Sequence, residues 1–218
     1  MRQIRSRPAL NFDRLTATPV EPVPFPFVIV PRFIEGSSRE DVAQDFPEVS
    51  QAGSYPLLSL RYGPAFGLLI DALTGPEMTK AVEQKFDIDL SGRPTMTTVR
   101  GRCEARDGHI HTDSKTKLIT MLLYMNDHED ADRGRLRILR SSSDLNDVAA
   151  EVPPDEGTLL IFRNGPNAWH GFEPISGPRR VIQVNWVTDE SVVRREQSRH
   201  RVSAFFKRLV GKSHAPAY

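Results

Sequence analysis

The feature that most constrains the fold is a series of short apolar segments between residues 96 and 187, separated by turn residues. Asp107-Gly108 and Asn164-Gly165-Pro166 are two of these turns, and such combinations interrupt regular secondary structure. No helix long enough for a parallel crossover is expected between the segments, which favours antiparallel strands. The sequence therefore predicts a mainly β fold, an antiparallel barrel or jelly roll. The expected strands are 96–104, 117–125, 136–139, 158–162, 168–172 and 180–187.

Helices are expected on both sides of this β region. The apolar residues of the C-terminal segment follow helical spacing, and its other positions are rich in Arg and Lys. Residues 1–24, rich in Pro, Arg and Thr, are expected to form an extended arm. The 218 residues suit a single domain over 25–188, followed by a basic amphipathic helix and tail over 189–218. The expected helices are 37–46, 75–86 and 189–210.

Composition excludes several classes of protein. Lys and Arg number 29 and Asp and Glu number 28, a net charge of +1 that argues against a dedicated nucleic-acid binder. The charge is unevenly distributed, because residues 190–218 hold seven basic and two acidic residues. The single cysteine, Cys103, excludes a disulfide framework and a cysteine-based zinc cluster. No stretch has the length and apolar character of a signal peptide or membrane span, so a cytoplasmic location is expected.

Histidines and carboxylates meet in one short segment. In an extended chain His109, His111 and Asp113 share a face, because alternate side chains point the same way. A His and an Asp on one strand are two of the three ligands of a non-haem iron triad. The second His-x-Asp match, at His128 and Asp130, falls in an acidic stretch that is better explained as a solvated turn. A third ligand must come from elsewhere in the chain.

Five fragments in a fixed order identify a family. The stretch 98–187 resembles the catalytic core of the prolyl-4-hydroxylase-type Fe(II)/2-oxoglutarate-dependent dioxygenases. The fragments are His111-Thr112-Asp113; Leu122-Leu123-Tyr124-Met125-Asn126; Gly134-Arg135-Leu136-Arg137-Ile138-Leu139; Pro154 to Phe162; and His170 followed by Pro174, Arg180 and Trp186.

This resemblance implies a double-stranded β-helix whose His111, Asp113 and His170 bind Fe(II). It implies 2-oxoglutarate as co-substrate, with Arg180 and Tyr124 at its distal carboxylate, and ascorbate as an optional reductant. A planar guanidinium suits a carboxylate, because it forms paired charge-assisted hydrogen bonds. Oxygen and 2-oxoglutarate would then be converted to succinate and CO2 as a C–H bond of the prime substrate is hydroxylated. Related halogenases replace the carboxylate ligand by a small residue, so the presence of Asp113 favours hydroxylation.

Other residues near the motifs are weaker candidates for pocket or supporting contacts. The family often has a tyrosine nine or ten residues before the first iron-binding histidine, but here that region reads Arg100-Gly101-Arg102-Cys103. Arg100 and Arg102 could therefore line the pocket or lie in solvent. Arg179 competes with Arg180 for 2-oxoglutarate, and Arg180 is preferred because its distance to Trp186 fits the family. His109 could hold His111 or simply be exposed, and Trp186 is better explained by packing than by catalysis.

The substrate is left open by the sequence. A protein side chain of the prolyl type or a small molecule would both suit the resemblance, with selection expected from residues 36–95 and 127–133. An alternative function is a non-catalytic barrel that binds a metal or a carboxylate and contacts a partner through its basic C-terminal helix. That helix is most simply a docking face with solvated charges, but it would also suit an anionic partner or membrane surface.

Overall fold

Two antiparallel sheets form the body of the protein. The computed structural model describes residues 7–126, 134–154 and 157–195. A six-stranded sheet has the order β1-β7-β4-β9-β3-β2, and a three-stranded sheet has the order β6-β5-β8. The strands of the larger sheet are β1 (Phe27–Val30), β7 (Leu159–Arg163), β4 (Lys117–Tyr124), β9 (Gly177–Val187), β3 (Thr95–Cys103) and β2 (Tyr55–Pro56). Those of the smaller sheet are β6 (Val148–Val152), β5 (Leu136–Leu139) and β8 (His170–Gly171).

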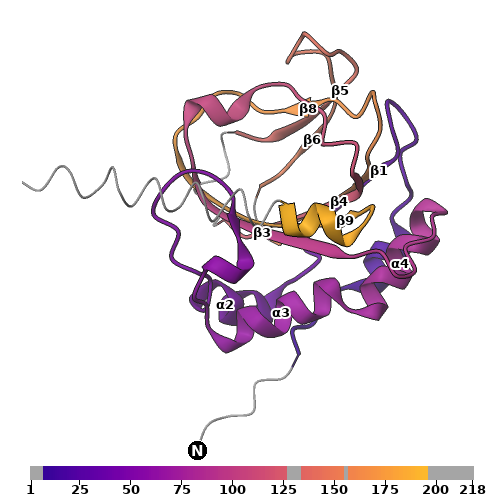
Figure 1. Ribbon diagram of the computed structural model, residues 1–218. Coiled ribbons are helices and arrows are strands. Elements are labelled where there is room, and N and C mark those ends of the chain that lie inside the picture. Colours follow the sequence, from indigo (N-terminus) through magenta and orange to yellow (C-terminus); the bar gives the residue numbers. More distant parts are fainter. Residues whose placement is uncertain (1–6, 127–133, 155–156, 196–218) are drawn as a thin grey trace, which may run out of the picture.

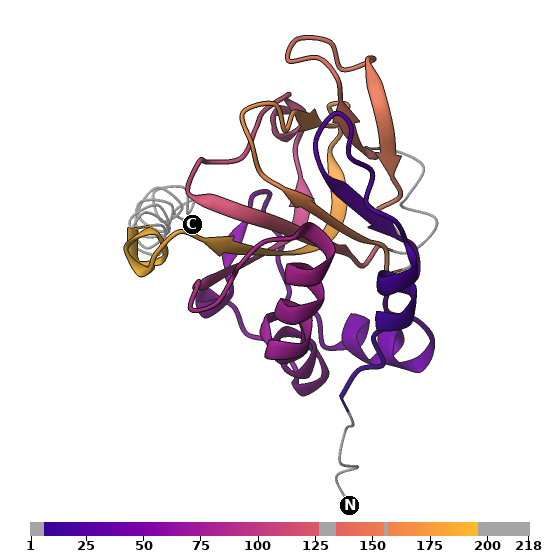
Figure 2. The ribbon, with the colours of Figure 1, turned by 90° about the vertical axis from the view of Figure 1, so that its right-hand side faces the viewer.

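Helices cover one face of the larger sheet, and the smaller sheet faces the other (Figures 1 and 2). Both α3 and α4 begin with a proline, at the position where a missing N–H costs nothing. The described helices are too short and too polar to include a membrane span. They are α1 (Phe12–Ala17), α2 (Gly36–Gln44), α3 (Pro64–Thr74) and α4 (Pro76–Phe86), with 3-10 turns η1 (Leu57–Ser59) and η2 (Ala105–Gly108). Residues 190–195, at the end of the described chain, are also helical.

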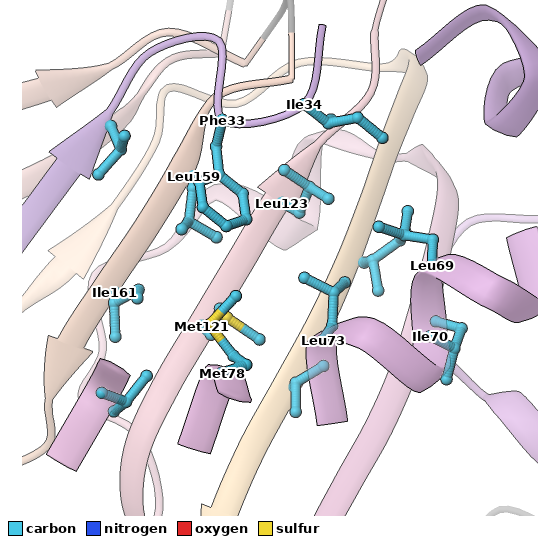
Figure 3. Packing of buried hydrophobic residues seen from close by; sticks show 14 of the residues in the cluster. Phe33, Ile34, Leu69, Ile70, Leu73, Met78, Met121, Leu123, Leu159 and Ile161 are labelled. Atoms are coloured by element: carbon cyan, nitrogen blue, oxygen red, sulfur yellow. The ribbon is translucent and has the colours of Figure 1, made fainter. Parts of the chain in front are cut away.

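Alternation along β4 divides the buried side chains into two cores. Met121 and Leu123 belong to a core between the larger sheet and the helices, where they pack near Leu69, Leu73 and Met78 (Figure 3). Leu122 and Tyr124 point to the opposite face and belong to the core between the two sheets, with Ile138, Phe162 and Phe172. We call these the helix side and the barrel side of the larger sheet. A strand that is buried on both faces is a nearly continuous apolar run, as Leu118 to Met125 is apart from Thr120.

The predicted antiparallel β architecture agrees with this arrangement, and β5 has the predicted bounds. The last strand starts at Gly177 instead of residue 180, and the strand expected over 168–172 is reduced to His170–Gly171. Helix α3, strands β2 and β6 and the two 3-10 turns were not predicted.

The predicted extended arm is wrong over Phe12–Ala17, which forms helix α1. Asn11 stabilises its first turn, because the side-chain oxygen accepts a hydrogen bond of 2.8 Å from the Arg14 N–H. The acidic loop 127–133 and most of the predicted C-terminal helix, including its apolar stripe over 202–210, lie outside the described residues.

Candidate active site

Backbone pairing brings the three predicted metal ligands together. His111, between η2 and β4, forms an isolated antiparallel bridge with His170, the first residue of β8. Each of the two N–H groups donates a 3.0 Å hydrogen bond to the carbonyl of the other residue. The imidazole rings lie 4.4 Å apart between centroids. One ligand atom from each of His111, Asp113 and His170 lies within 4.8 Å of the others.

Main-chain carbonyls fix the orientation of both imidazoles. Nδ1 of His111 lies 3.1 Å from the carbonyl of His109, and Nδ1 of His170 lies 2.9 Å from the carbonyl of Ala168. Because a carbonyl oxygen can only accept, Nδ1 carries the proton in both rings and Nε2 keeps a free lone pair. Burial, assisted by the neighbouring His111, lowers the pKa of His170 to about 4. Its ring is therefore neutral at pH 7, the form that binds metals.

The Asp113 carboxylate is held on both oxygens. Lys117 Nζ lies 2.7 Å from Oδ1, and the Thr120 hydroxyl donates a short hydrogen bond to Oδ2. Burial would raise the pKa of Asp113, but the charge of Lys117 and these hydrogen bonds outweigh that effect and lower it. The carboxylate is therefore ionised at neutral pH.

A chain of amides supports Thr120 from behind. The Asn185 amide donates a 2.8 Å hydrogen bond to the Thr120 hydroxyl, and the Gln183 amide donates one of 3.0 Å to Asn185 Oδ1. Asn185 pairs with Thr120 across β4 and β9, so both side chains lie on the barrel side with Asp113. This buried network fixes the carboxylate in one position.

The ligand set suits a divalent metal. Two imidazoles and one carboxylate on one side of a site form the facial triad of non-haem Fe(II) proteins. Hydrogen bonds from ligands to outer partners, as seen here for all three residues, are the usual companions of a metal site. Within the described ranges, no other set of three or more His, Cys, Asp or Glu residues has comparable geometry.

Replacing Thr120 by valine is expected to weaken metal binding by about tenfold or more, since outer partners of metal ligands contribute roughly 10–100-fold. Valine keeps the shape of threonine but cannot hold the Asp113 carboxylate. Titration of the protein with Mn(II) in a calorimeter measures the effect, and Thr120→Ser, which keeps the hydroxyl, is the control. Equal Mn(II) affinities of the valine and serine variants would contradict this role.

Arg179, and not Arg180, lies with Tyr124 on the barrel side. Its guanidinium carbon lies 4.2 Å from the Phe172 ring centroid and 5.4 Å from that of Tyr124. It donates hydrogen bonds to the carbonyl of Gly134 and to the Tyr124 side chain. The structure therefore reverses the preference for Arg180. That guanidinium lies 5.8 Å from the ring of Phe46, which packs on the helix side.

The Arg179 guanidinium is buried without a counter-charge. The residue is 4% exposed, and no carboxylate of the described residues forms an ion pair with it. A buried cation of this kind is costly unless an anion compensates it. Burial raises the pKa of the adjacent Tyr124, while Arg179 opposes that rise, so the phenol is protonated and can donate a hydrogen bond. Together the two side chains are suited to a ligand carboxylate.

The remaining predicted residues lie at the edge of the site or away from it. Trp186 is fully buried, but it belongs to the helix-side core, on the face of the larger sheet opposite to the metal triad. Arg102 is exposed, because an irregularity between Arg100 and Arg102 changes which side chains face inward. The His109 side chain is exposed, with its ring centroid 5.1 Å from that of His111.

Three residues that the sequence did not single out do lie near the site. Lys117 and Thr120 contact Asp113, and Asn185 supports Thr120. Each is a polar residue in an otherwise apolar strand. That pattern points to a site only when it is known which face of the strand the side chain lies on.

Comparisons with known proteins agree with this geometry. Residues 102–188 match the model of the 2OG-Fe(II) oxygenase superfamily, which confirms the resemblance over that part of the chain. No curated protein matches the sequence.

Solved structures with a similar fold include two prolyl 4-hydroxylases. That of Pseudomonas putida has 15% identity and a TM-score of 0.53 over 82% of this chain and 97% of its own. That of Phytophthora capsici has 15% identity and a TM-score of 0.51 over 88% of this chain and 69% of its own. A structure described as IDO from Bacillus thuringiensis has 14% identity and a TM-score of 0.50 over 75% of this chain and 93% of its own. At such low identity the likeness establishes the fold alone.

Proposed function

We propose that this protein is an Fe(II)- and 2-oxoglutarate-dependent dioxygenase that hydroxylates a C–H bond. The observation that carries the proposal is the combination of two sites in one barrel. A His111–Asp113–His170 triad suits iron. Arg179, which is buried beside Tyr124 and has no ion-pair partner among the described residues, suits the distal carboxylate of a 2-oxo dicarboxylic acid. The match of residues 102–188 to the 2OG-Fe(II) oxygenase superfamily supports the same chemistry.

Each residue has a defined task in this proposal. His111, Asp113 and His170 would hold the iron, and Arg179 and Tyr124 would bind and orient the far end of 2-oxoglutarate. Bound iron and 2-oxoglutarate supply the oxidising power, with O2 consumed and succinate and CO2 released. The chain itself contributes fixed ligands, an oriented co-substrate and an apolar barrel side that excludes water.

The prime substrate is proposed at the level of a class. A protein side chain of the prolyl type and a small molecule are both compatible with the site, and the carboxylate ligand Asp113 favours hydroxylation over halogenation. The alternative of a non-catalytic barrel is less favoured, because it does not explain why a complete triad and a buried arginine both lie on the barrel side of the larger sheet.

The proposal is tested by adding Fe(II) and 2-oxoglutarate to the protein without oxygen and then admitting air. A weak visible absorption band is expected before air is admitted, and succinate is expected afterwards, even without prime substrate. The Asp113→Ala variant is the control and should give neither signal. If the wild-type protein gives neither the band nor succinate, the oxygenase proposal fails and the non-catalytic alternative is favoured.

A further inference from the structure

Lys117 is a largely buried cation at the edge of the metal triad. It opens β4, and its pairing with β9 is irregular between Lys117 and Ile119, so that the lysine reaches the barrel side together with Thr120. Its side chain is 16% exposed, and that of Asp113 is 10% exposed. Lysine is seldom buried without a specific partner.

The ammonium group has more donors than the protein satisfies. It carries three N–H donors, and one of them bonds Asp113 Oδ1 at 2.7 Å. No acceptor among the described residues forms a hydrogen bond with the other two. A mostly buried ammonium needs acceptors for these N–H groups, because leaving the donors of a charged group without partners costs free energy. The two remaining donors are therefore available to oxygen atoms of a ligand.

The charge balance of the site favours an anionic ligand. A divalent cation together with Lys117 would bring three positive charges against the single carboxylate of Asp113. The ammonium lies 2.7 Å from Asp113 Oδ1, at the edge of the ligand set. At such short range and low exposure, opposite charges attract strongly. A ligand carboxylate beside the triad would offset the excess.

We propose that Lys117 is a carboxylate-binding residue beside the metal triad. This inference rests on the proposed function, because it takes the triad to hold a metal. The carboxylate has two sources, the group next to the keto carbon of 2-oxoglutarate or an acidic group of the prime substrate. Lys117 thus adds a second cation to the candidate site. It lies at the start of β4, whereas Arg179 lies beside Tyr124 at the end of that strand.

The test compares Lys117→Met with Lys117→Arg, which keeps the charge, and with Lys115→Met, which removes a charge from a neighbouring exposed position. The proteins are saturated with Mn(II), whose dissociation constant is measured separately for each variant. Calorimetric titration then follows binding of 2-oxoglutarate and of 2-oxopentanoate, which lacks the distal carboxylate. A third titration uses the free amino acids and their primary amides in the presence of N-oxalylglycine.

If Lys117 binds the co-substrate, the methionine variant weakens both 2-oxo acids about tenfold, while the arginine and Lys115 variants bind them normally. If Lys117 binds the prime substrate, the methionine variant binds both 2-oxo acids as the wild type does. In the third titration the wild-type protein then binds an amino acid more tightly than its amide, and the methionine variant binds the two equally. The inference is overturned if Lys117→Met and Lys115→Met bind the 2-oxo acids, the amino acids and the amides equally well, whether or not their Mn(II) affinities differ. Failure of the wild-type protein to bind 2-oxoglutarate would instead overturn the proposed function.

Discussion

His170→Ala is expected to abolish stoichiometric Fe(II) binding, with a loss of affinity beyond the roughly 100-fold that outer partners of metal ligands can account for. The reason is that His170 is one of three ligand-bearing residues within 4.8 Å, and its removal leaves one imidazole and one carboxylate. Anaerobic titration with Fe(II), followed by metal analysis of the desalted protein, measures the loss. Succinate formation should disappear with it.

His109→Ala is the matched control for this variant. His109 lies beside His111, but its side chain is exposed, and only its backbone carbonyl orients the His111 ring. The variant keeps that carbonyl, so Fe(II) binding should be retained. A circular dichroism spectrum and a thermal unfolding curve establish that both variants are folded. The proposed triad would be wrong if His170→Ala retained stoichiometric Fe(II) or if His109→Ala alone lost it.

The triad could be predicted from the sequence because its signal is local. His111 and Asp113 are two residues apart, and strand alternation alone places them on one side. His170 required the family resemblance, since nothing in the sequence itself shows that residue 170 pairs with residue 111. The pairing of distant strands depends on the complete fold, and the backbone bridge between the two histidines became evident only in the structure.

The structure favours Arg179 over the predicted Arg180 for a reason that can be identified. In β9 the even positions Ile182, Val184 and Trp186 are buried on the helix side, while the odd positions Gln183 and Asn185 face the barrel. Counting back by twos along this alternation leads to Arg179. The polar residues Gln183 and Asn185 therefore indicate which side of the strand faces the barrel. A prediction that is wrong by one residue places the arginine on the opposite face of the sheet.

Two helical elements were mispredicted because their sequence signals are mixed. Helix α3 contains Pro64 and Gly67, which suggest a loop, yet its apolar residues pack against the larger sheet. Burial of this surface outweighs the low helix propensity of glycine. Helix α1 has a single buried residue, Leu15, and too few turns to show a periodic pattern. Both helices form because of their tertiary packing, which cannot be read from a short stretch of sequence.

Arg179→Met is expected to weaken 2-oxoglutarate binding by about 100-fold, because loss of hydrogen bonds to a charged group costs about 3 kcal/mol. Metal affinity should change little, since Arg179 contacts Tyr124, Phe172 and Gly134 and none of the triad. Calorimetric titration of the Mn(II)-loaded protein with 2-oxoglutarate measures the loss. Titration with 2-oxopentanoate should show equal affinities for wild type and variant, because that acid has no distal carboxylate.

Arg180→Met separates this role from a general effect of charge. It removes the same charge one residue away, but from a side chain that lies over Phe46 on the helix side, so 2-oxoglutarate affinity should change by less than about threefold. A large loss in Arg180→Met with normal binding in Arg179→Met would return the co-substrate contact to Arg180. Equal losses of 2-oxoglutarate and 2-oxopentanoate in Arg179→Met would show that the guanidinium shapes the barrel instead of binding the distal carboxylate. Arg179 is buried and has no carboxylate partner among the described residues, so the second carboxylate of a ligand would neutralise its charge, which favours the selective loss.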